Sequence, residues 1–415
     1  MNINQLKILK YNKINTDQER KDWLRYFYRY TELILTHSFA RAHIYIANRI
    51  ISKLIIRLSQ FIEPIHKLPD NNMFCILITG GVGDSIVIAR LIRDIQKYLN
   101  YQFDFDVYFH SPNMIRPIFK NICGFRDVLH ENIYHYSKSH YMFSMSANTL
   151  VTFNNELINY SLLLLKSSEV LKLFSNIELF RKKENLDKFI RNHPFLDGAF
   201  ADVQSKLGRV RYSFMHEMMG LEYSGHKLNI DVDIQVLKKY DLNDVNYITI
   251  HDGWDENFKF ISSRPTKAIP LNVWSLIIAN IKNLYPNHLI VQIGGPKGEV
   301  INGVDICLKN KTPFLDAISI LSFSHMHFDS ESGLVHLASA LGVRSMVFFG
   351  PTNFDWFSYP ENVNIKPSEC GNCWWSTENW MNSCPLGYID PICINHDQNI
   401  INFFDKKEIV NVQSN

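Results

Sequence analysis

The feature that most constrains the fold is an apolar run that ends in a glycine-rich turn and continues into an amphipathic helix. Residues 73–79 read Met-Phe-Cys-Ile-Leu-Ile-Thr, a short apolar run of the kind that a strand buried on both faces requires, and residues 80–84 read Gly-Gly-Val-Gly-Asp. Residues 85–99 have helical periodicity, and residues 103–109 alternate like a second strand. Strand, turn, helix and strand form a βαβ unit, which predicts a parallel sheet.

The same pattern starts again in the second half of the chain. Strands are predicted at residues 245–250, 288–293, 325–329 and 345–349, and helices at 271–284, 313–321 and 333–341. A chain of 415 residues is long enough for two such units. We therefore predict an α/β protein with two Rossmann-like, doubly wound domains, at residues 71–235 and 236–415, whose strand ends face a shared cleft.

An N-terminal helical segment is predicted for residues 1–70. Apolar residues recur there in steps of four from Ile46 to Ile62, while Arg49, Lys53 and Arg57 share another face. Such a helix docks on the main body, contacts the inner membrane surface through residues 42–62, or binds a partner. No secretory signal and no long uncharged apolar run is seen, so a cytoplasmic protein, peripheral to the membrane at most, is expected.

The net charge and the first turn exclude two classes of function. A formal net charge of +2 gives no overall attraction to nucleic acid. The turn has Ile86 where a dinucleotide fingerprint needs its third glycine, and no Lys-Ser/Thr pair follows as in a P-loop. A nicotinamide-dependent oxidoreductase is therefore disfavoured. The turn offers Asp84 at the head of a helix, either as a capping carboxylate or as a base at the mouth of the cleft.

Several motifs, taken in order, resemble a known family. Gly80-Gly-Val-Gly-Asp84 in the first half is followed in the second by residues 331–342, ESGLVHLASALG, and residues 349–352, FGPT. This combination resembles the bacterial heptosyltransferases of glycosyltransferase family 9 over about residues 73–365. The resemblance implies the GT-B fold, with an N-terminal acceptor domain and a C-terminal donor domain. It also implies inverting transfer from ADP-heptose.

The resemblance also implies roles for single residues. Asp84 matches the family's general base, and Lys267, after Thr266 and before Pro270, matches a lysine that contacts the donor phosphate. Glu299 falls where a family carboxylate reaches the donor nucleoside. Glu331 stands where the family usually has Asp, so its sugar contact departs from the pattern. The nearby glycines predicted to let the donor approach the backbone are Gly81, Gly83 and Gly295.

Elementary electrostatics supports a donor site in the second half. Ser332 and Gly333 open a predicted helix whose free amides suit a pyrophosphate, so transfer needs no metal. His251 follows a strand and either lines the same phosphate pocket or has a plain loop role. His336, inside the helix, either packs in the core or reaches the donor.

Four cysteines, Cys370, Cys373, Cys384 and Cys393, lie close together in the sequence. Their spacing favours a closed structural Zn or Fe site over disulfides or free thiols, and His396 could replace one cysteine. A cysteine motif of this kind on a family 9 body resembles autotransporter heptosyltransferases, which bind iron and glycosylate proteins.

We therefore expect a glycosyltransferase that moves a sugar, heptose above all, from a nucleotide-diphosphate donor to a hydroxyl. The acceptor is left open between lipopolysaccharide or another lipid-linked glycan and protein, and a homo-oligomer is left open as well. The alternative is a non-catalytic binding or assembly protein built on the same fold.

Overall fold

The computed structural model describes residues 43, 73–153, 155–158, 160–254, 264–367 and 369–396. Apart from residue 43, the predicted N-terminal helical segment and its membrane contact at residues 42–62 lie outside the described residues. No helix among those described is both long and apolar enough to cross a membrane.

The first domain contains a five-stranded sheet. Its strands lie in the order β3-β2-β1-β4-β5, all parallel except β5, which pairs antiparallel with β4. Their bounds are β1 Met73–Ile78, β2 Asp104–Phe109, β3 Phe125–His130, β4 Phe143–Ala147 and β5 Val151–Phe153.

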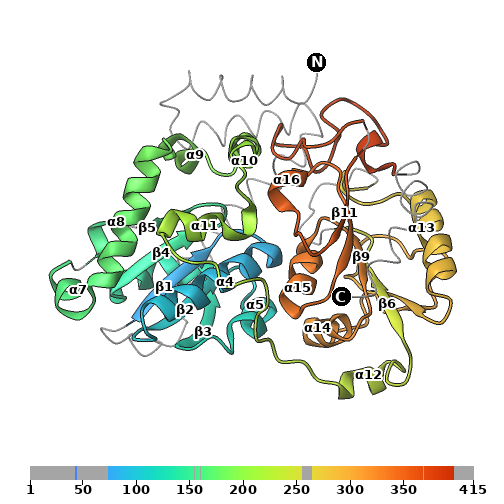
Figure 1. Cartoon of the computed structure of the whole chain (residues 1–415), viewed down its shortest axis with the longest axis horizontal. Coiled ribbons are helices and arrows are strands. Elements are labelled where there is room, and N and C mark those ends of the chain that lie inside the picture. The colour runs from blue at the N-terminus through green and yellow to red at the C-terminus, as the bar shows by residue number, and fades with distance from the viewer. Residues whose placement is uncertain are drawn as a thin grey trace.

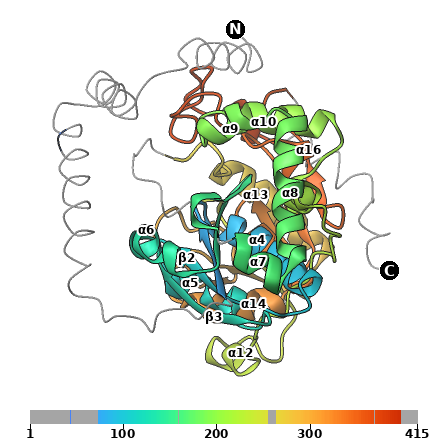
Figure 2. The same ribbon diagram turned by 90° about the vertical axis from the view of Figure 1, so that its left-hand side faces the viewer.

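Helices cover this sheet and then continue as a helical region. Figure 1 shows the domain in blue and green, and Figure 2 shows α8 running along its side. The bounds are α4 Val82–Tyr98, α5 Pro112–Phe119, α6 Tyr134–Ser137, α7 Tyr160–Lys166, α8 Ser168–Lys183, α9 Asp187–Arg191, α10 Asp197–Lys206 and α11 Arg211–Met219, with short 3-10 turns at Glu131–Ile133, Lys138–His140 and Asn155–Leu157.

The second domain contains a six-stranded parallel sheet in the order β11-β10-β9-β6-β7-β8. Counted within the domain, this is the 3-2-1-4-5-6 order of a Rossmann fold. Its strands are β6 Tyr247–Ile250, β7 Leu289–Gln292, β8 Ile306–Cys307, β9 His327–Ser330, β10 Ser345–Phe348 and β11 Val363–Ile365. Its helices are α13 Leu271–Leu284, α14 Phe314–Ser322, α15 Gly333–Leu341, α16 Phe354–Phe357 and the 3-10 turn Ile392–Ile394, with α12 Gln235–Lys239 preceding the sheet.

The predicted fold class, two Rossmann-like domains in a GT-B arrangement, is confirmed by these sheets. Two predicted helices, 271–284 and 333–341, have the bounds that periodicity gave them. Helix α4 begins at Val82, three residues before the predicted start, because the glycine turn is itself the first turn of the helix. The exact boundaries of 71–235 and 236–415 remain predictions.

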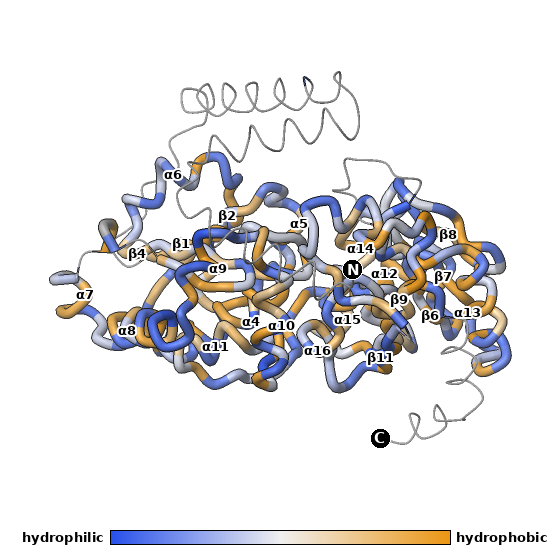
Figure 3. The backbone as a smooth tube through the Cα atoms, turned by 90° about the horizontal axis from the view of Figure 1, so that it is seen from above, coloured by the Kyte–Doolittle hydropathy of each residue, from blue (hydrophilic) through white to orange (hydrophobic). Residues whose placement is uncertain are grey.

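The two domains pack directly on each other through α4 and α15. One hydrophobic cluster is continuous across them, since it includes Phe74 and Ile86 of the first domain and Leu337 and Trp356 of the second. In Figure 3 the hydrophobic stretches run along the central elements, α4 among them, whereas many outer turns are hydrophilic. This packing brings the heads of α4 and α15 together at the junction.

Candidate active site between the two domains

A pocket of about 1040 Å³ lies where the two domains meet. The first domain contributes the turn after β1, Asn148 after β4, and the helical region near His193 and Arg211. The second contributes segments that follow β6, β7 and β9. In each sheet the strand order reverses between strands 1 and 4, so the pocket joins the two topological switch points where such sheets bind ligands. Nearly all the predicted donor and catalytic residues line it: Gly81, Gly83, Asp84, His251, Lys267, Gly295, Glu331, Ser332, Gly333 and His336.

Asp84 is held in place by two contacts at the head of α4. Its Oδ2 accepts a hydrogen bond from the backbone N–H of Gly81 (2.9 Å), and its Oδ1 pairs with Nη2 of Arg211 (2.6 Å). The Asp84 side chain remains 28% exposed, so the carboxylate can still be reached from the pocket. A Cβ on Gly80 would lie 2.1 Å from its Oδ2, which is why a glycine precedes it. Asp84 thus caps the helix and lines the pocket, and its role as a base remains a prediction.

Arg211 is a pocket residue that the sequence analysis missed. It is 2% exposed, and besides Asp84 its Nη2 donates to the carbonyl of Asn148 (2.6 Å). Its Nη1 is buried and has no hydrogen-bond partner among the described residues. Arg211 begins α11, and the residues around it match no motif for a ligand or catalytic site, so the sequence did not mark it.

A histidine and an aspartate form a second pair on the same wall, also missed by the sequence analysis. Nδ1 of His193 lies 3.0 Å from the carboxylate of Asp197, and both residues line the pocket. Burial disfavours the charged imidazolium, but the hydrogen bond to Asp197 and the charges of Asp197 and Asp84 together outweigh burial, so the pKa of His193 is raised. The wall therefore alternates two carboxylates with two basic groups.

The second domain presents the N-terminus of α15 to the pocket. Ser332 is the N-cap, since its Oγ accepts from the N–H of Leu334 (3.1 Å) while donating to Asp329. Gly333 lies close to the head of α4, because a Cβ there would be 3.4 Å from the backbone nitrogen of Gly83. Two helix N-termini thus converge on the pocket, an arrangement that favours an anion.

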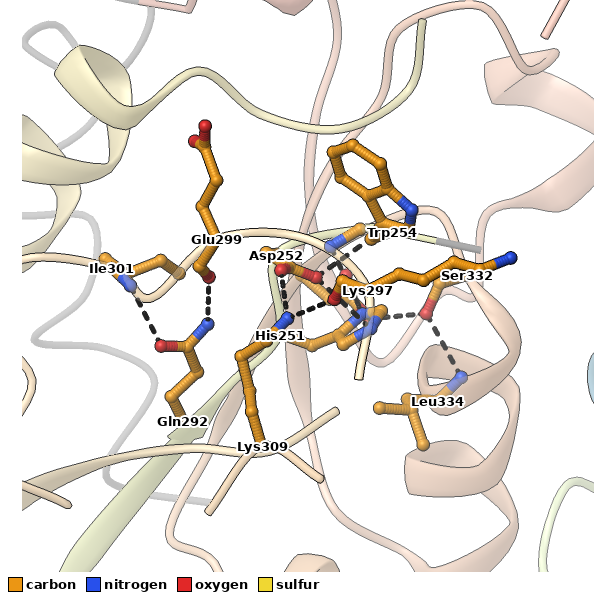
Figure 4. Close-up of polar contacts among 12 residues, drawn as sticks. His251, Asp252, Trp254, Gln292, Lys297, Glu299, Ile301, Lys309, Ser332 and Leu334 are labelled. Atoms are coloured by element: carbon orange, nitrogen blue, oxygen red, sulfur yellow. Dashed lines mark hydrogen bonds and ion pairs between the residues drawn. The ribbon is translucent and has the colours of Figure 1, made fainter. Parts of the chain in front are cut away.

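His251 extends this electropositive side of the pocket. Its Nδ1 lies 3.0 Å from Oδ1 of Asp329, which is fully buried. Burial disfavours the imidazolium, but the charge and hydrogen bond of Asp329 and the charge of Asp252 together outweigh burial and raise the pKa of His251. The pKa of Asp329 is lowered to about 2, because hydrogen bonds and charge from His251 and His327 overcome its burial. Figure 4 shows His251 beside Asp252, whose Oδ2 pairs with Lys309.

Lys267 lies in a loop that the C-terminal segment holds in place. The backbone N–H of Thr266 donates to the carbonyl of Met381, and its Oγ1 donates to the carbonyl of Trp380, each at 2.9 Å. Trp380 and Met381 line the pocket beside Lys267, as do Trp374 and Trp375. The cysteine-bearing segment therefore builds one wall of the pocket and positions the lysine loop.

Glu299 is the predicted donor residue that lies apart from the described pocket lining. Its carbonyl accepts from Nε2 of Gln292 (2.9 Å), and in Figure 4 its carboxylate extends away from the other labelled side chains. The residue is exposed. Its contact with a donor nucleoside remains a prediction.

The four predicted metal-binding cysteines are free thiols that interact with one another. A hydrogen bond between Cys370 and Cys393 lowers the pKa of Cys370 to about 6 and, with burial, raises the pKa of Cys393. Cys373 and Cys384 lie near enough to add to that rise. Four thiols are a donor set that suits Zn or Fe. Among the described residues, however, no group of three or more potential ligands is arranged to hold a metal ion, so the site remains a prediction.

Comparisons with known proteins give distant structural similarity only. No protein-family profile and no curated sequence matches the chain. Among solved structures, it is similar to an iron-containing dodecameric glycosyltransferase, TibC, from enterotoxigenic E. coli (13% identity, 82% of this chain and 78% of that one, TM-score 0.49). It is also similar to ADP-heptose lps heptosyltransferase II of E. coli (12%, 81% and 99%, TM-score 0.43) and to a family 9 glycosyl transferase of Veillonella parvula (11%, 72% and 86%, TM-score 0.42).

Proposed function

We propose that this chain is an inverting glycosyltransferase that transfers a sugar, heptose in the first instance, from an ADP-sugar donor to a hydroxyl acceptor. The observation that carries the proposal is the shared pocket. Asp84 at the head of α4 lies on one wall, and Lys267 and the N-terminus of α15 lie on the other. The order of sequence motifs supports the same assignment.

The second domain takes the donor in this proposal. The amides at Ser332 and Gly333 and the ammonium of Lys267 bind the diphosphate and stabilise the negative charge that grows on it as the sugar leaves. Glu331, which lines the pocket, binds sugar hydroxyls. No catalytic metal is invoked, because backbone amides and a lysine supply the positive field.

The first domain takes the acceptor. Asp84 removes the proton of the acceptor hydroxyl as its oxygen attacks the anomeric carbon from the face opposite the diphosphate, which inverts that carbon. Arg211 holds the Asp84 carboxylate through one oxygen. The Trp374, Trp375 and Trp380 side chains give the acceptor an aromatic wall, suited to sugar rings and to peptide alike.

The cysteine segment holds a structural Zn or Fe in this proposal. The interaction of Cys393 with the other three thiols supports it, and so does the position of buried His396 three residues after Cys393. Such a metal would fix the wall that positions Lys267.

The direct test is to incubate the purified protein with ADP-heptose labelled in the sugar, together with either lipopolysaccharide or total cell protein. Label in the lipid fraction identifies a glycolipid acceptor, and label in the protein fraction identifies a protein acceptor. Asp84→Asn in parallel reactions should leave both fractions unlabelled. Absence of label from both fractions with the wild-type protein would contradict the proposal.

One observation favours the alternative of a non-catalytic binding protein. Both oxygens of Asp84 already accept hydrogen bonds, from Gly81 and Arg211, as they would in a purely structural cap. That alternative predicts that Asp84→Asn leaves the cellular phenotype intact, whereas a transferase loses it.

A further inference from the structure

A chain of hydrogen bonds connects the core of the first domain with the pocket wall of the second. It begins at Arg90 on α4, which is fully buried and whose Nη1 donates to the hydroxyl of Tyr359 (2.7 Å). That hydroxyl lies 2.7 Å from Nδ1 of His336 on α15. Nε2 of His336 lies 3.3 Å from Oε1 of Glu331. His336 and Glu331 line the pocket, so the chain ends where the donor would bind.

For a neutral His336, one set of bond directions lets every group in the chain form its hydrogen bond. A guanidinium can only donate, so the Tyr359 oxygen accepts from Arg90 and has its single proton left for His336. Nδ1 of His336 is then an acceptor, and a neutral imidazole with an unprotonated Nδ1 carries its proton on Nε2. That N–H faces the carboxylate of Glu331, which can only accept. All three bonds agree on one tautomer.

Packing holds the members of the chain in this geometry. The ring of Tyr359 stacks on that of Tyr212, with centroids 5.2 Å apart and 15° between planes. The imidazole of His336 packs against the glycine turn, since a Cβ on Gly83 would lie 2.6 Å from its Cδ2. Gly83, the third glycine of the turn, is therefore needed for this contact between domains. Burial raises the pKa of Tyr359, which keeps the hydroxyl proton in place.

We propose that Tyr359 is a positioning residue that, oriented by Arg90, holds His336 in the Nε2–H tautomer. Through that N–H, His336 fixes the Glu331 carboxylate in the orientation in which it meets the donor sugar. The second half of this statement rests on the proposed function, whereas the tautomer does not. Arg90 of the first domain thereby determines, through Tyr359, which nitrogen of His336 donates a hydrogen bond in the second domain.

The tautomer can be read in the full-length, ligand-free protein by ¹⁵N NMR of histidine side chains, with His336→Gln to assign the signal. The wild-type protein should show His336 protonated at Nε2. Tyr359→Phe keeps the stacked ring and removes the hydroxyl, so the signal should move toward a mixture of tautomers. Tyr247→Phe is the matched control: Tyr247 is also buried in the second domain, and its hydroxyl donates to the carbonyl of Ile320 (2.7 Å). The control should leave the His336 signal unchanged.

Calorimetric titration with ADP-heptose then separates positioning from folding. Tyr359→Phe should weaken donor binding about 3- to 10-fold, as expected for one neutral hydrogen bond, and Tyr247→Phe should not. A wild-type His336 protonated at Nδ1, or an unchanged tautomer in Tyr359→Phe, would overturn the proposal. If Tyr359→Phe does not fold, the wild-type spectrum alone tests the proposed tautomer of His336. A shifted tautomer with unchanged donor affinity would refute the link to the ligand, and no donor binding by any protein would refute the proposed function while the tautomer assignment stands.

Discussion

At the scale of single residues, the proposed mechanism requires that the Asp84 carboxylate, which caps a helix, also take a proton. Asp84 accepts from Gly81 with one oxygen and from Arg211 with the other, yet more than a quarter of its side chain is exposed. The contacts orient the carboxylate without closing the pocket over it. A structural cap and a base can therefore be the same residue.

Replacing this carboxylate tests its role as a base. Asp84→Asn keeps the shape but cannot take a proton, so transfer should fall by about 10²- to 10⁴-fold while donor affinity is retained. Turnover with ADP-heptose and calorimetric titration with ADP measure the two effects. Asp231→Asn, an exposed carboxylate paired with Lys120, serves as control. Turnover above about half of wild type in Asp84→Asn would show that the base is another group.

Lys267 should affect donor binding and turnover together. In the proposed mechanism its ammonium meets the diphosphate in the ground state and more strongly in the transition state, so Lys267→Ala should raise the ADP dissociation constant on the order of tenfold and lower kcat as well. Lys282→Ala, on the exposed side of α13, should change neither. A Lys267→Ala protein that binds ADP as tightly as wild type would show that the lysine does not contact phosphate.

The pH dependence of donor binding should follow His251. Its pKa is raised in the folded protein, so the imidazolium is present at and somewhat above its ordinary pKa of about 6.5 and is lost as the pH rises through the raised value. ADP binding should therefore weaken with rising pH, on the order of tenfold for one charged hydrogen bond. The charged groups around the ring are Asp329, Asp252, Lys309 and His327.

Titrations of wild type and His251→Gln with ADP over about pH 6 to 9 check this. The ionisation of ADP itself is common to both proteins, so their difference isolates the histidine. The variant should bind more weakly at low pH and approach wild type at high pH. Parallel curves for the two proteins would mean that His251 does not face the phosphate.

At the scale of elements, the C-terminal segment connects the cysteines with the lysine loop. It holds Thr266 through backbone carbonyls and lines the pocket with tryptophans. Elemental analysis of the purified protein should find about one Zn or Fe per chain, because four thiols suit such a metal.

Each of Cys370→Ser, Cys373→Ser, Cys384→Ser and Cys393→Ser should lower metal content and melting temperature together, since a closed metal site contributes to folding free energy. Cys123→Ser, an exposed cysteine of the first domain, is the control. Activity of the folded fraction should fall less than in Asp84→Asn. A stable, fully active preparation without metal would contradict the site.

Elements with strong local patterns could be predicted from the sequence, and those formed by long-range pairing could not. The run 73–79 and the helices 271–284 and 333–341 have unambiguous periodicity, and the structure places them there. The antiparallel strand β5 is three residues long and exists only through its pairing with β4, so no local signal marks it. Arg211 and the His193–Asp197 pair also lack a local signal in the sequence, because they reach the pocket only through the packing of helices.

At the scale of the whole molecule, two domains make one site because their switch points meet. Helices α4 and α15 pack together, and the hydrophobic cluster crosses the junction. In the proposed function the first domain supplies the carboxylate for the acceptor and the second supplies the anion site for the donor. The sequence motifs lie about 250 residues apart, from Asp84 to Glu331, and only the folded chain brings them to the same pocket.

The most direct test of this account is an experimental structure of the protein with bound ADP. The account predicts the diphosphate at the N-terminus of α15, in contact with the amides at Ser332 and Gly333 and with Nζ of Lys267, and facing Asp84 across the pocket. ADP bound outside this pocket, or bound in it with its phosphates away from both α15 and Lys267, would contradict the account.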